Sequence, residues 1–234
     1  ITSMSFSPTD RIMLEDFLHG PQVSTESIVI EGKVSTIGFS DRNYEYLDKY
    51  APHIIEDGGD LPSFLSNEDQ NLITEAVEKT AAALKITNGV IKGDMVLSDG
   101  HPYIIEIATR LSGGYFCSHE IPLNTGVDFV RLAIKLAIGE SICEKSLLAC
   151  QNLPVSQRYF FPKPGIVKKI VVPDWVVKEP NIKLFEIRVS VGDLLSEATH
   201  HPSRAGLVIT SGADRNDALM LAKNVVRDVQ IVTE

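Results

Sequence analysis

The sequence is poor in cysteine and aromatic residues, and it carries no excess of basic side chains. Its three cysteines are an odd number without a CxxC pair, which argues against a disulfide framework or a cysteine-rich zinc site and fits reduced thiols in a cytosolic protein. Lysine and arginine number 22 against 31 acidic residues, a net charge of −9. We therefore expect no nucleic-acid or anionic-membrane partner, because no basic excess is available to replace counterions.

Long apolar runs are missing as well. No stretch approaches the ~20 residues that span a bilayer, and the first twenty residues lack the apolar core of a signal peptide. The sequence therefore predicts a cytoplasmic protein without a membrane partner. Its 44% hydrophobic and 23% charged residues predict a folded chain, and its 234 residues predict roughly one to two domains. Because Ile1 is not an initiator methionine, we expect a processed or incomplete chain.

The first third of the sequence has strand and loop patterns. A strand-like run over residues 11–18 comes first. A β-hairpin is predicted next, with alternating polar and apolar residues over 23–30, a turn at Glu31-Gly32 and a return strand over 33–39. Residues 40–66 contain charges, aromatics and two prolines, so we expect a long structured loop there. Loops of this length are usually functional.

Two helices and a second hairpin are predicted in the middle of the sequence. Ser66 begins a capping box for a helix that extends to Ile86. Residues 89–108 have the pattern of a hairpin that turns at Asp99-Gly100. Residues 128–138 form the second helix, which a glycine then ends.

The best candidate for a domain boundary is the irregular segment 141–157. Beyond it, the pattern changes to short strands and one last helix, at residues 158–161, 165–172, 184–189, 205–210 and 215–226. We therefore predict an α+β fold in two parts, with one domain over residues 1–145 and a smaller one over residues 146–234.

The most informative feature is a pair of acids, Asp94 and Glu106, inside otherwise apolar strand segments. A buried carboxylate is costly unless it is paired or coordinates a metal. If the two acids face each other, a cation between them would relieve their repulsion. Hard oxygen ligands without cysteine or histidine favour Mg²⁺ or Mn²⁺, and Mg²⁺ usually takes substrate phosphates as further ligands.

The turn between the two strands leaves two registers open. An odd-length loop would place Asp94 directly opposite Glu106 on one face of the hairpin. The dipeptide Asp99-Gly100 instead favours a two-residue type I′ turn, which pairs Asp94 with Ile105 and turns Glu106 to the other face. In that second register, both acids would be ordinary solvated strand residues.

A loop with an arginine follows the second acid. Arg110 can bind a phosphate or carboxylate through two hydrogen bonds. Ser112, Gly113 and Gly114 come directly after it, and glycines let backbone N–H groups approach an anion closely. Together with Asp94 and Glu106, these residues indicate a site for a phosphorylated substrate.

These motifs carry a resemblance to a known family. The run from Asp94 through Glu106-Ile-Ala-Thr-Arg110-Leu-Ser-Gly-Gly114 resembles the metal and phosphate segment of ATP-grasp enzymes. Residues 13–26 resemble their hinge and the start of a nucleotide-covering hairpin, and Thr125-Gly-Val-Asp128 before a helix is also similar. With the C-terminal segment, the sequence is most similar to carboxylate–amine ligases of the L-amino-acid ligase type. The resemblance covers nearly the whole chain.

The resemblance implies a role for each matching position. Asp94 and Glu106 would hold the magnesium that bridges the ATP phosphates. Arg110 would stabilise the transferred phosphoryl group or the acyl phosphate, and the loop of Ser112, Gly113 and Gly114 would contact the nucleotide. In the hinge, Glu15 and the backbone of Phe17 and Leu18 would hold the adenine, while Gln22, where relatives often have glutamate, would bind the ribose hydroxyls.

The sequence also departs from the family pattern. Ala108 stands where relatives usually have asparagine, which implies one metal contact fewer and puts a two-metal arrangement in doubt. Asp94 is shorter than the glutamate of many relatives. No counterpart of the family's preceding domain, glycine-rich loop or ATP-binding lysines lies before Ile1. We therefore expect the second part of such an enzyme, which needs the preceding region for a complete ATP site.

The implied activity is that of an ATP-dependent ligase. Mg·ATP would phosphorylate a carboxylate to an acyl phosphate, and an amine would attack it to form an amide. One alternative is a nucleotide-binding or structural module that has lost catalysis, and another is a carboxylase-type relative that uses bicarbonate. The expected partners are a small-molecule carboxylate and amine, with a homodimer as the commonest assembly. In the C-terminal part, Arg204 is a candidate for a substrate carboxylate, although a salt bridge is the more ordinary role.

Overall fold

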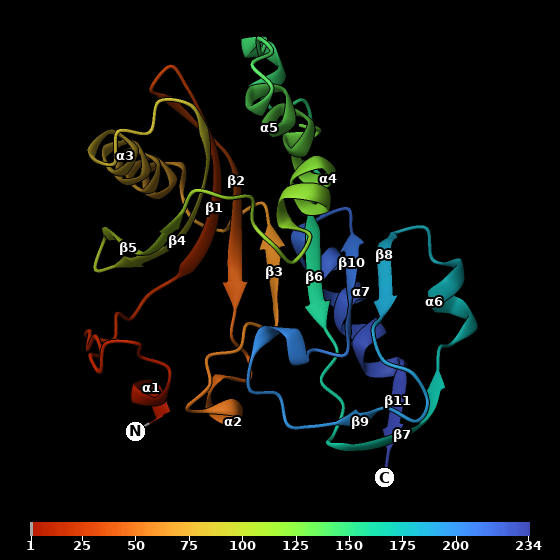
Figure 1. The fold of residues 1–234 in the computed structure, drawn as a ribbon. Coiled ribbons are helices and arrows are strands. Elements are labelled where there is room, and N and C mark those ends of the chain that lie inside the picture. Colours follow the sequence, from red (N-terminus) through yellow and green to blue (C-terminus); the bar gives the residue numbers. More distant parts are fainter. Residues whose placement is uncertain (1) are drawn as a thin grey trace.

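An eight-stranded antiparallel sheet forms the centre of the computed structural model, which describes residues 2–234 (Figure 1). Its strands lie in the order β5-β4-β1-β2-β3-β6-β10-β8. Their bounds are β1 (Gln22–Ile30), β2 (Lys33–Asn43), β3 (Gly58–Leu61), β4 (Gly89–Ser98), β5 (His101–Ala108), β6 (Val155–Tyr159), β8 (Ile182–Ile187) and β10 (Gly206–Ser211). The predicted α+β class is confirmed, with antiparallel strands and helices packed against them.

Helices and a small second sheet surround this centre. The second sheet has the order β11-β7-β9, formed by Gln230–Thr233, Gly165–Val171 and Leu194–Leu195. The helices are α1 (Thr2–Ser5), α2 (Leu47–Tyr50), α3 (Asn67–Ala83), α4 (Ile121–Thr125), α5 (Phe129–Ala137), α6 (Asp174–Lys178) and α7 (Arg215–Asp228). Three single turns complete the list: the π-helical η1 (Phe116–Glu120) and the 3₁₀ turns η2 (Glu144–Leu147) and η3 (His201–Ser203). No helix among the described residues has the length and apolar character needed to cross a membrane.

The local signals of the sequence produce the elements next to the site. Glu31 and Gly32 both have positive φ, 51° and 79°, which is the geometry of a type I′ turn that closes the β1–β2 hairpin. The Ser66 hydroxyl accepts the Asp69 backbone N–H at 3.1 Å and so begins α3. Asp128 begins α5 in the same way. The predicted hairpins and these two helices are therefore confirmed.

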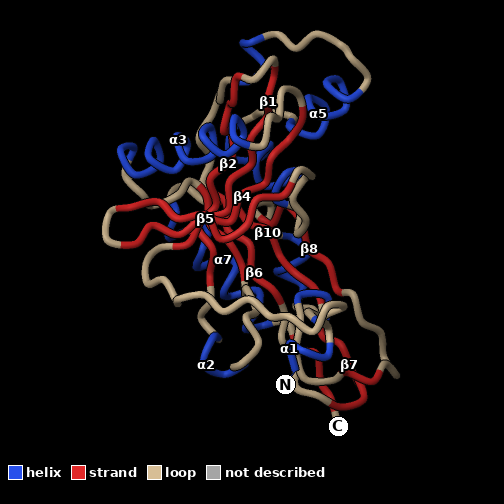
Figure 2. The backbone as a smooth tube through the Cα atoms, turned by 60° about the vertical axis from the view of Figure 1, so that its left-hand side comes forward, coloured by secondary structure: helices blue, strands red, loops and turns tan. Residues whose placement is uncertain are grey.

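Each face of the sheet has its own hydrophobic core. On one face, the buried side chains of Ile73 and Val77 in α3 pack with Val23, Ile91 and Met95 of β1 and β4. On the other face, η1, α4 and α5 pack against the sheet, with the following buried members: Ile28, Leu61, Phe116, Ile121, Val127, Phe129 and Leu132. Figure 2 shows α3 and α5 lying beside β1 and β2. Because strand residues alternate between the faces, neighbours in sequence serve different cores.

The sheet continues through the segment where a domain boundary is predicted. β3 pairs with β6, so strands from both predicted domains belong to one sheet. α7 covers β6 and β10 through Ala222 and Val225, which pack with Val208. The division at residue 145 falls in the 3₁₀ turn η2, between α5 and β6, and stays a prediction.

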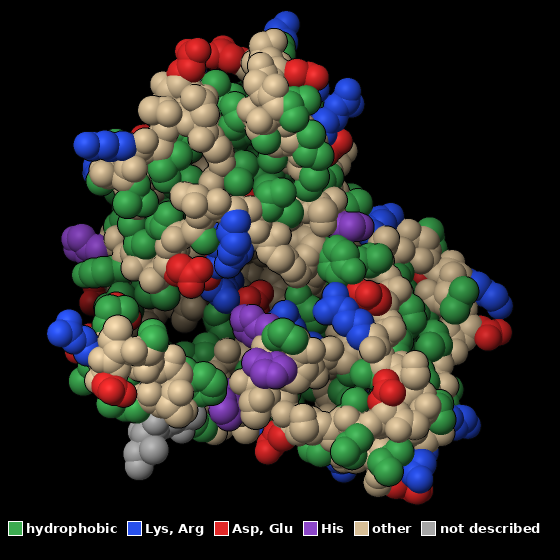
Figure 3. Space-filling model, in the orientation of Figure 1, with side chains coloured by type: hydrophobic (Ala, Val, Ile, Leu, Met, Phe, Trp, Pro, Cys, Tyr) green, Lys and Arg blue, Asp and Glu red, His purple; other side chains and the backbone are tan. Residues whose placement is uncertain are grey.

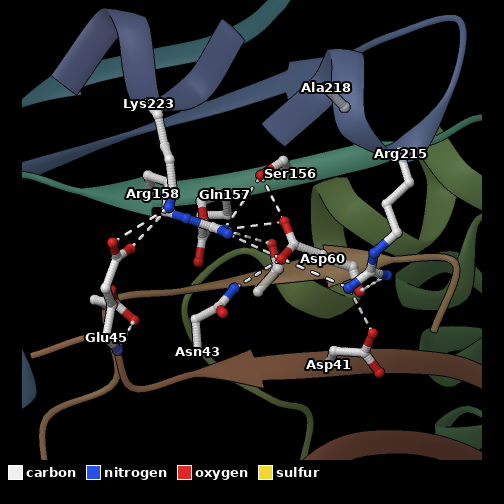
Figure 4. A network of polar contacts seen from close by, with 12 residues as sticks. Asp41, Asn43, Glu45, Asp60, Ser156, Gln157, Arg158, Arg215, Ala218 and Lys223 are labelled. Atoms are coloured by element: carbon white, nitrogen blue, oxygen red, sulfur yellow. Dashed lines mark hydrogen bonds and ion pairs between the residues drawn. The ribbon is translucent and has the colours of Figure 1, made fainter. Parts of the chain in front are cut away.

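A buried polar network ties β3 to β6 (Figure 4). The Asp60 carboxylate accepts hydrogen bonds from Arg158 Nη1 at 3.0 Å and Nη2 at 2.9 Å, and also from Ser156 Oγ at 2.6 Å. Arg215 at the start of α7 pairs with Asp41 at 2.6 Å and approaches Asp60 at 3.6 Å. Burial alone would raise the pKa of Asp60, but Arg158 and the hydrogen bonds lower it overall. The network therefore holds α7 and β6 in a fixed position against β2 and β3.

Two sequence-based expectations are wrong. Residues 11–18 form no strand: both edges of β1 are occupied by β2 and β4, and the run remains exposed, with Leu14 93% accessible. Residues 40–66 are only partly loop, since β2 extends to Asn43 and α2 and β3 follow. Gly58-Gly59, which we interpreted as loop residues, begin the strand that connects the two parts of the sheet.

Candidate active site

A cavity of about 410 Å³ opens on the sheet face opposite α3. Figure 3 shows a hollow in the middle of one face of the molecule, with basic, acidic and histidine side chains around it. The walls come from β1 to β6, the loop after β5, η1 and the turn η3. Acidic and basic side chains line it together, which distinguishes it from an apolar ligand pocket.

Strand alternation and register bring the polar wall together. Glu106, Asp94, Ser24 and Ser40 form one cross-strand row over β5, β4, β1 and β2. Lys92, two residues before Asp94, shares its face. All five residues line the cavity.

The β4–β5 hairpin combines the two registers that the sequence left open. It closes through the two-residue turn at Asp99-Gly100, with Ser98 opposite His101. A β-bulge then places one extra residue of β5, Ile105, beside Asp94, so that Asp94 pairs with Glu106. The favoured turn and the shared face of the acids therefore occur together.

Asp94 lies between two cations. Arg42 Nη1 is 2.8 Å from its Oδ1, the Ser24 hydroxyl donates to the same oxygen at 3.0 Å, and Lys92 contacts Oδ2. Only 11% of the Asp94 side chain is accessible. Burial would raise its pKa, but Arg42 and Lys92 lower it overall, so the group is a carboxylate at neutral pH.

Glu106 and Arg110 form the exposed rim of the cavity. Their side chains are 56% and 58% accessible, and the Arg110 guanidinium is 3.7 Å from the Glu106 carboxylate. An exposed pair at this distance is weak and free to rearrange around a ligand. Arg110 can therefore turn toward a phosphate without breaking a buried contact.

The carboxylates of this cavity fit a hard divalent cation whose remaining coordination positions are filled by a bound ligand. Among the described residues, no group of three or more His, Cys, Asp or Glu side chains could hold a metal by itself. Asp94 and Glu106 supply two carboxylates on one wall, and Mg²⁺ is usually held by one or two carboxylates together with substrate phosphates. Lys92 and Arg42 would have to move from Asp94 toward those phosphates.

Glu26 on β1 holds the loop after β5 in place through hydrogen bonds to Ser112. The Glu26 carboxylate accepts the Ser112 backbone N–H at 3.2 Å and also bonds to the Ser112 hydroxyl. Burial raises the pKa of Glu26 to about 7, although these hydrogen bonds and the charge of Lys92 act to lower it. A Cβ on Gly113 would meet nothing within 4 Å, so the backbone there is open to a ligand. Gly114 has φ +65° and lies against the Tyr159 hydroxyl.

The other end of the cavity contains Glu120 and Arg204. Glu120 is the last residue of η1, is 2% accessible, and its side chain has no hydrogen bond or ion pair with the residues that the structure describes. Arg204 packs over the Tyr159 ring, 3.6 Å from its centroid. It forms no salt bridge within the described part of the chain, contrary to its more ordinary interpretation from the sequence.

Six of the ten residues that the resemblance assigns to the ATP and metal site line this cavity: Asp94, Glu106, Arg110, Ser112, Gly113 and Gly114. Glu15, Phe17 and Leu18 lie on the irregular segment before β1, and Gln22 begins β1 beside Val96, so none of the four lines it. Their adenine and ribose roles stay predictions.

Sequence reasoning missed several cavity residues. Lys92 could have been found, because a residue two before Asp94 in a strand shares its face. Arg42 and Glu56 lie in the segment that we expected to be a loop, where no periodicity marks them. One feature of the sequence could have pointed to Glu120 as a site residue: it is an acidic residue beside apolar ones in the stretch that follows the glycine loop. Ala108 pairs with Lys92 across the hairpin, so a lysine faces the position where asparagine was expected.

Comparison with protein families gives two matches that together cover most of the chain. Residues 2–114 match the ATP-grasp domain family. Residues 158–234 match the family described as L-amino acid ligase C-terminal domain 2. The first match contains the β1–β2 hairpin and the acids of β4 and β5, and the second contains β10 and α7.

Individual relatives agree with this assignment. Biotin carboxylase from Pseudomonas aeruginosa is 25% identical over 227 residues, which are 93% of this chain and 47% of that protein. Phosphoribosylglycinamide synthetase from Anaerococcus prevotii superimposes with a TM-score of 0.80 at 19% identity, over 99% of this chain and 58% of that one. L-amino acid ligase from Bacillus licheniformis superimposes with a TM-score of 0.80 at 20% identity, over 93% of this chain and 55% of that protein. The chain thus spans about half the length of these proteins, and the structural likenesses establish the ATP-grasp fold.

Proposed function

We propose that the chain forms the metal-binding core and C-terminal domain of an ATP- and Mg²⁺-dependent carboxylate–amine ligase, because residues 2–114 match the ATP-grasp domain family and residues 158–234 match the C-terminal domain 2 of L-amino acid ligases. The reaction begins when a substrate carboxylate oxygen attacks the γ-phosphorus of ATP, which yields an acyl phosphate and ADP. An amine then attacks the acyl carbon, a C–N bond forms while the bond from the acyl carbon to the phosphate oxygen breaks, and phosphate and a proton from the amine are released. The product is an amide or peptide bond.

The observation that carries the proposal is the shared wall of Asp94 and Glu106, with Lys92, Arg42 and Arg110 around it. Phosphoryl transfer in enzymes depends mainly on positioning and on stabilisation of negative charge. Three cations beside two carboxylates provide both, since the cations bind phosphate oxygens and the acids hold a metal ion.

Each of these residues has a defined role in the proposal. Asp94 and Glu106 hold Mg²⁺, or Mn²⁺, which when bound neutralises charge on the ATP phosphates. Arg110 moves from Glu106 to the transferred phosphoryl group and then to the acyl phosphate. Ser112 and Gly113 keep the loop backbone close to the phosphates.

The proposal extends to the parts outside the cavity. Glu15, Phe17, Leu18 and Gln22 bind the adenosine part of ATP once the segment before β1 closes over it. The division into residues 1–145 and 146–234, a cytoplasmic location and a homodimeric assembly are part of the same proposal.

The test is ATP turnover by the native protein that contains this chain. Purified protein with ATP, Mg²⁺ and pooled L-amino acids is expected to release ADP and phosphate, and Glu106→Gln is expected to reduce that release at least 100-fold. Glu75→Gln on α3 is the matched control: its side chain is 58% accessible and lies 3.6 Å from Lys79 four residues on, as Glu106 lies near Arg110. Equal loss in both variants, or none in Glu106→Gln, would refute the assigned role. ATP binding without turnover in wild type would favour the module that has lost catalysis.

A further inference from the structure

The turn η3 reaches the proposed active site from the C-terminal part of the chain. His201 at its start and Arg204 directly after it line the cavity, together with Arg42 and Glu56 from the first half of the chain. The proposed phosphoryl transfer gives this turn no task. A side chain in the wall of a cavity can still contribute to a reaction by holding its neighbours in position.

Two hydrogen bonds attach η3 to the backbone of Glu56. The Glu56 N–H donates to His201 Nε2 at 3.3 Å, and Arg204 Nη1 donates to the Glu56 carbonyl at 3.1 Å. Arg204 Nε also donates to the His201 carbonyl at 2.9 Å, so both side chains belong to one arrangement of the turn. Among the described residues, these two bonds to Glu56 are the only hydrogen bonds between residues 200–204 and the first half of the chain.

The side chain of Glu56 continues this connection to the proposed metal site. Its Oε2 pairs with Arg42 Nη2 at 2.9 Å, and Arg42 Nη1 pairs with Asp94 Oδ1 at 2.8 Å. The Glu56 and Arg42 side chains are only 21% and 12% accessible, so water screens these ion pairs weakly. Direct contacts of 3.3 Å or less therefore link His201 to Asp94 through Glu56 and Arg42.

The first contact in this series requires a neutral histidine. Because a backbone N–H can only donate, Nε2 of His201 must accept, and the ring carries its single proton on Nδ1. Protonation of Nε2 would direct two N–H groups at each other and break the bond to Glu56. The contact between the two halves of the chain therefore depends on the charge of one imidazole.

The surroundings of His201 favour its neutral form. Burial lowers its pKa, and the charges of Arg204 on the same turn and Arg42 on β2 lower it further. The acids that face it, Glu56 and Asp94, act to raise the pKa but do not cancel this effect. The docked turn therefore binds a proton more weakly than a released turn does, so the contact is complete above about pH 6.5 and is lost as the pH falls below that value.

We propose that neutral His201 is a positioning residue of the active site, which docks η3 on Glu56 and so keeps Arg42 in place beside Asp94, and that protonation of His201 releases the turn. The role of the positioned residues in catalysis rests on the proposed ligase function, whereas the docking contact does not. The C-terminal part thereby completes the wall of the metal site in the other half of the chain, and acid uncouples the two.

Amide hydrogen exchange of the native protein, without nucleotide or metal, measures the docking contact directly. The protection of the Glu56 N–H, corrected for the intrinsic exchange rate at each pH, is expected to fall about five- to tenfold between pH 7.5 and pH 5.5. The Val127 N–H is the matched control, because it donates to the Thr125 hydroxyl at 3.1 Å and a hydroxyl does not titrate in this range. Protection of Glu56 that does not change with pH, or an equal loss at Val127, would overturn the proposal.

Variants assign the pH dependence to one ring. His201→Gln keeps an acceptor at the reach of Nε2 but does not titrate, so Glu56 is expected to stay protected down to pH 5.5. His201→Ala removes the acceptor and is expected to lose the protection at both pH values. His53→Gln is the matched control: it lies three residues before Glu56, and its ring makes no hydrogen bond with the described residues, so it is expected to behave as wild type. Wild-type pH dependence in His201→Gln, or its loss in His53→Gln, would contradict the proposal.

Binding of Mn²⁺ with ADP measures the effect on the metal site without any turnover. Once Glu56 is released, Asp94 is the remaining ion-pair partner of Arg42 and competes more strongly for it against the metal. His201→Ala is therefore expected to bind Mn²⁺·ADP about 3- to 10-fold more weakly at pH 7.5, and His201→Gln is expected to restore wild-type affinity. Equal affinity of all three proteins would show that His201 does not position the metal site. Should His201→Ala not fold, the affinities of wild type and His201→Gln at pH 5.5 decide the question, since only wild type is expected to weaken.

ATP turnover distinguishes this inference from the ligase proposal. If exchange and Mn²⁺·ADP binding behave as expected but ATP is never turned over, the ligase function fails while the positioning role stands. If ATP is turned over and kcat falls equally below pH 6.5 in wild type and His201→Gln, the positioning role fails while the ligase stands.

Discussion

Asp94 and Glu106 face each other across β4 and β5, yet 11% of one side chain and 56% of the other are accessible. The buried acid is held by Arg42, Lys92 and Ser24, whereas the only ion pair of the exposed acid among the described residues is with Arg110, at 3.7 Å. The two acids share a proposed metal but differ in what they contribute to the fold. One is part of a buried charge cluster, and the other is a free rim ligand.

Asp94→Asn is therefore expected to lower the free energy of unfolding more than Glu106→Gln does. Asp94→Asn leaves two part-buried cations beside a neutral amide, and loss of one member of a buried ion pair costs about 3–5 kcal/mol. Because some water reaches this site, we expect the free energy of unfolding to fall by about 2–3 kcal/mol. Glu106→Gln removes an exposed pair, for which about 0.5 kcal/mol or less is expected.

Urea unfolding of both variants, without metal or nucleotide, measures this difference. Mn²⁺ binding in the presence of ADP provides the second readout, and both variants are expected to lose it. Equal stability of the two variants would mean that Arg42 and Lys92 do not depend on Asp94. Retained Mn²⁺ binding would contradict the shared metal site.

The charge of Glu26 makes stability depend on pH. Burial raises its folded-state pKa from 4.5 to about 7. The folded protein therefore binds this proton more tightly than the unfolded chain, and stability falls as pH rises between about 4.5 and 7. At ~1.4 kcal/mol per pKa unit, the loss due to Glu26 is about 3 kcal/mol above pH 7.

Glu26→Gln isolates this contribution, because glutamine keeps an acceptor for Ser112 but does not titrate. Urea unfolding of wild type and variant at pH 5, 6, 7 and 8 is expected to show the variant gaining relative stability as pH rises. Other buried acids, such as Glu120, titrate equally in both proteins and cancel in the difference. A difference that stays constant over the four pH values would show that Glu26 has an ordinary pKa.

The position of the acids could be only partly predicted from the sequence. Residue type and the resemblance predicted that Asp94 and Glu106 form a pair and that Arg110 lies near them. The dipeptide Asp99-Gly100 predicted the type I′ turn. Turn chemistry alone placed Glu106 on the wrong face, because the extra residue at Ile105 shifts the pairing of β5 with β4 by one residue and has no local sequence signal. The missed strand β3 has a similar cause, since Gly58-Gly59 has low strand propensity and pairs only because β2 and β6 flank it.

The contact between Asp60 and Arg158 is expected to be essential for joining β6 to β3. Asp60→Asn leaves the buried guanidinium without its charge partner, so we expect a loss of about 3 kcal/mol or more in unfolding free energy. The double variant Asp60→Leu with Arg158→Met removes both charges and is expected to be more stable than Asp60→Asn alone. Thermal and urea unfolding measure all three proteins. A double variant that is less stable than the single one would show that the pair itself stabilises the fold beyond the avoidance of an unpaired charge.

Gly113 and Gly114 are neighbours in one loop, but only Gly114 is in a conformation and a position that require glycine. Substitutions at the two positions are therefore expected to separate an effect on stability from an effect on ligand binding. A Cβ on Gly114 would meet the Tyr159 hydroxyl at 2.9 Å, and its φ of +65° disfavours any residue with a side chain, so Gly114→Ala is expected to cost about 1–2 kcal/mol of stability. A Cβ on Gly113 meets no atom within 4 Å, so Gly113→Ala should leave the melting temperature unchanged.

Nucleotide affinity is expected to respond in a different way from stability. If the Gly113 backbone approaches the ATP phosphates, a methyl group at that position blocks it, and Gly113→Ala should weaken ATP binding at least tenfold. Gly32→Ala at the tip of the β1–β2 hairpin, also without a neighbour within 4 Å but with positive φ, shows how much a turn glycine alone contributes to stability. Melting curves with and without Mg·ATP give both quantities. A Gly113→Ala protein with wild-type ATP affinity would mean that the loop holds the phosphates through Arg110 and Ser112 and not through its open backbone.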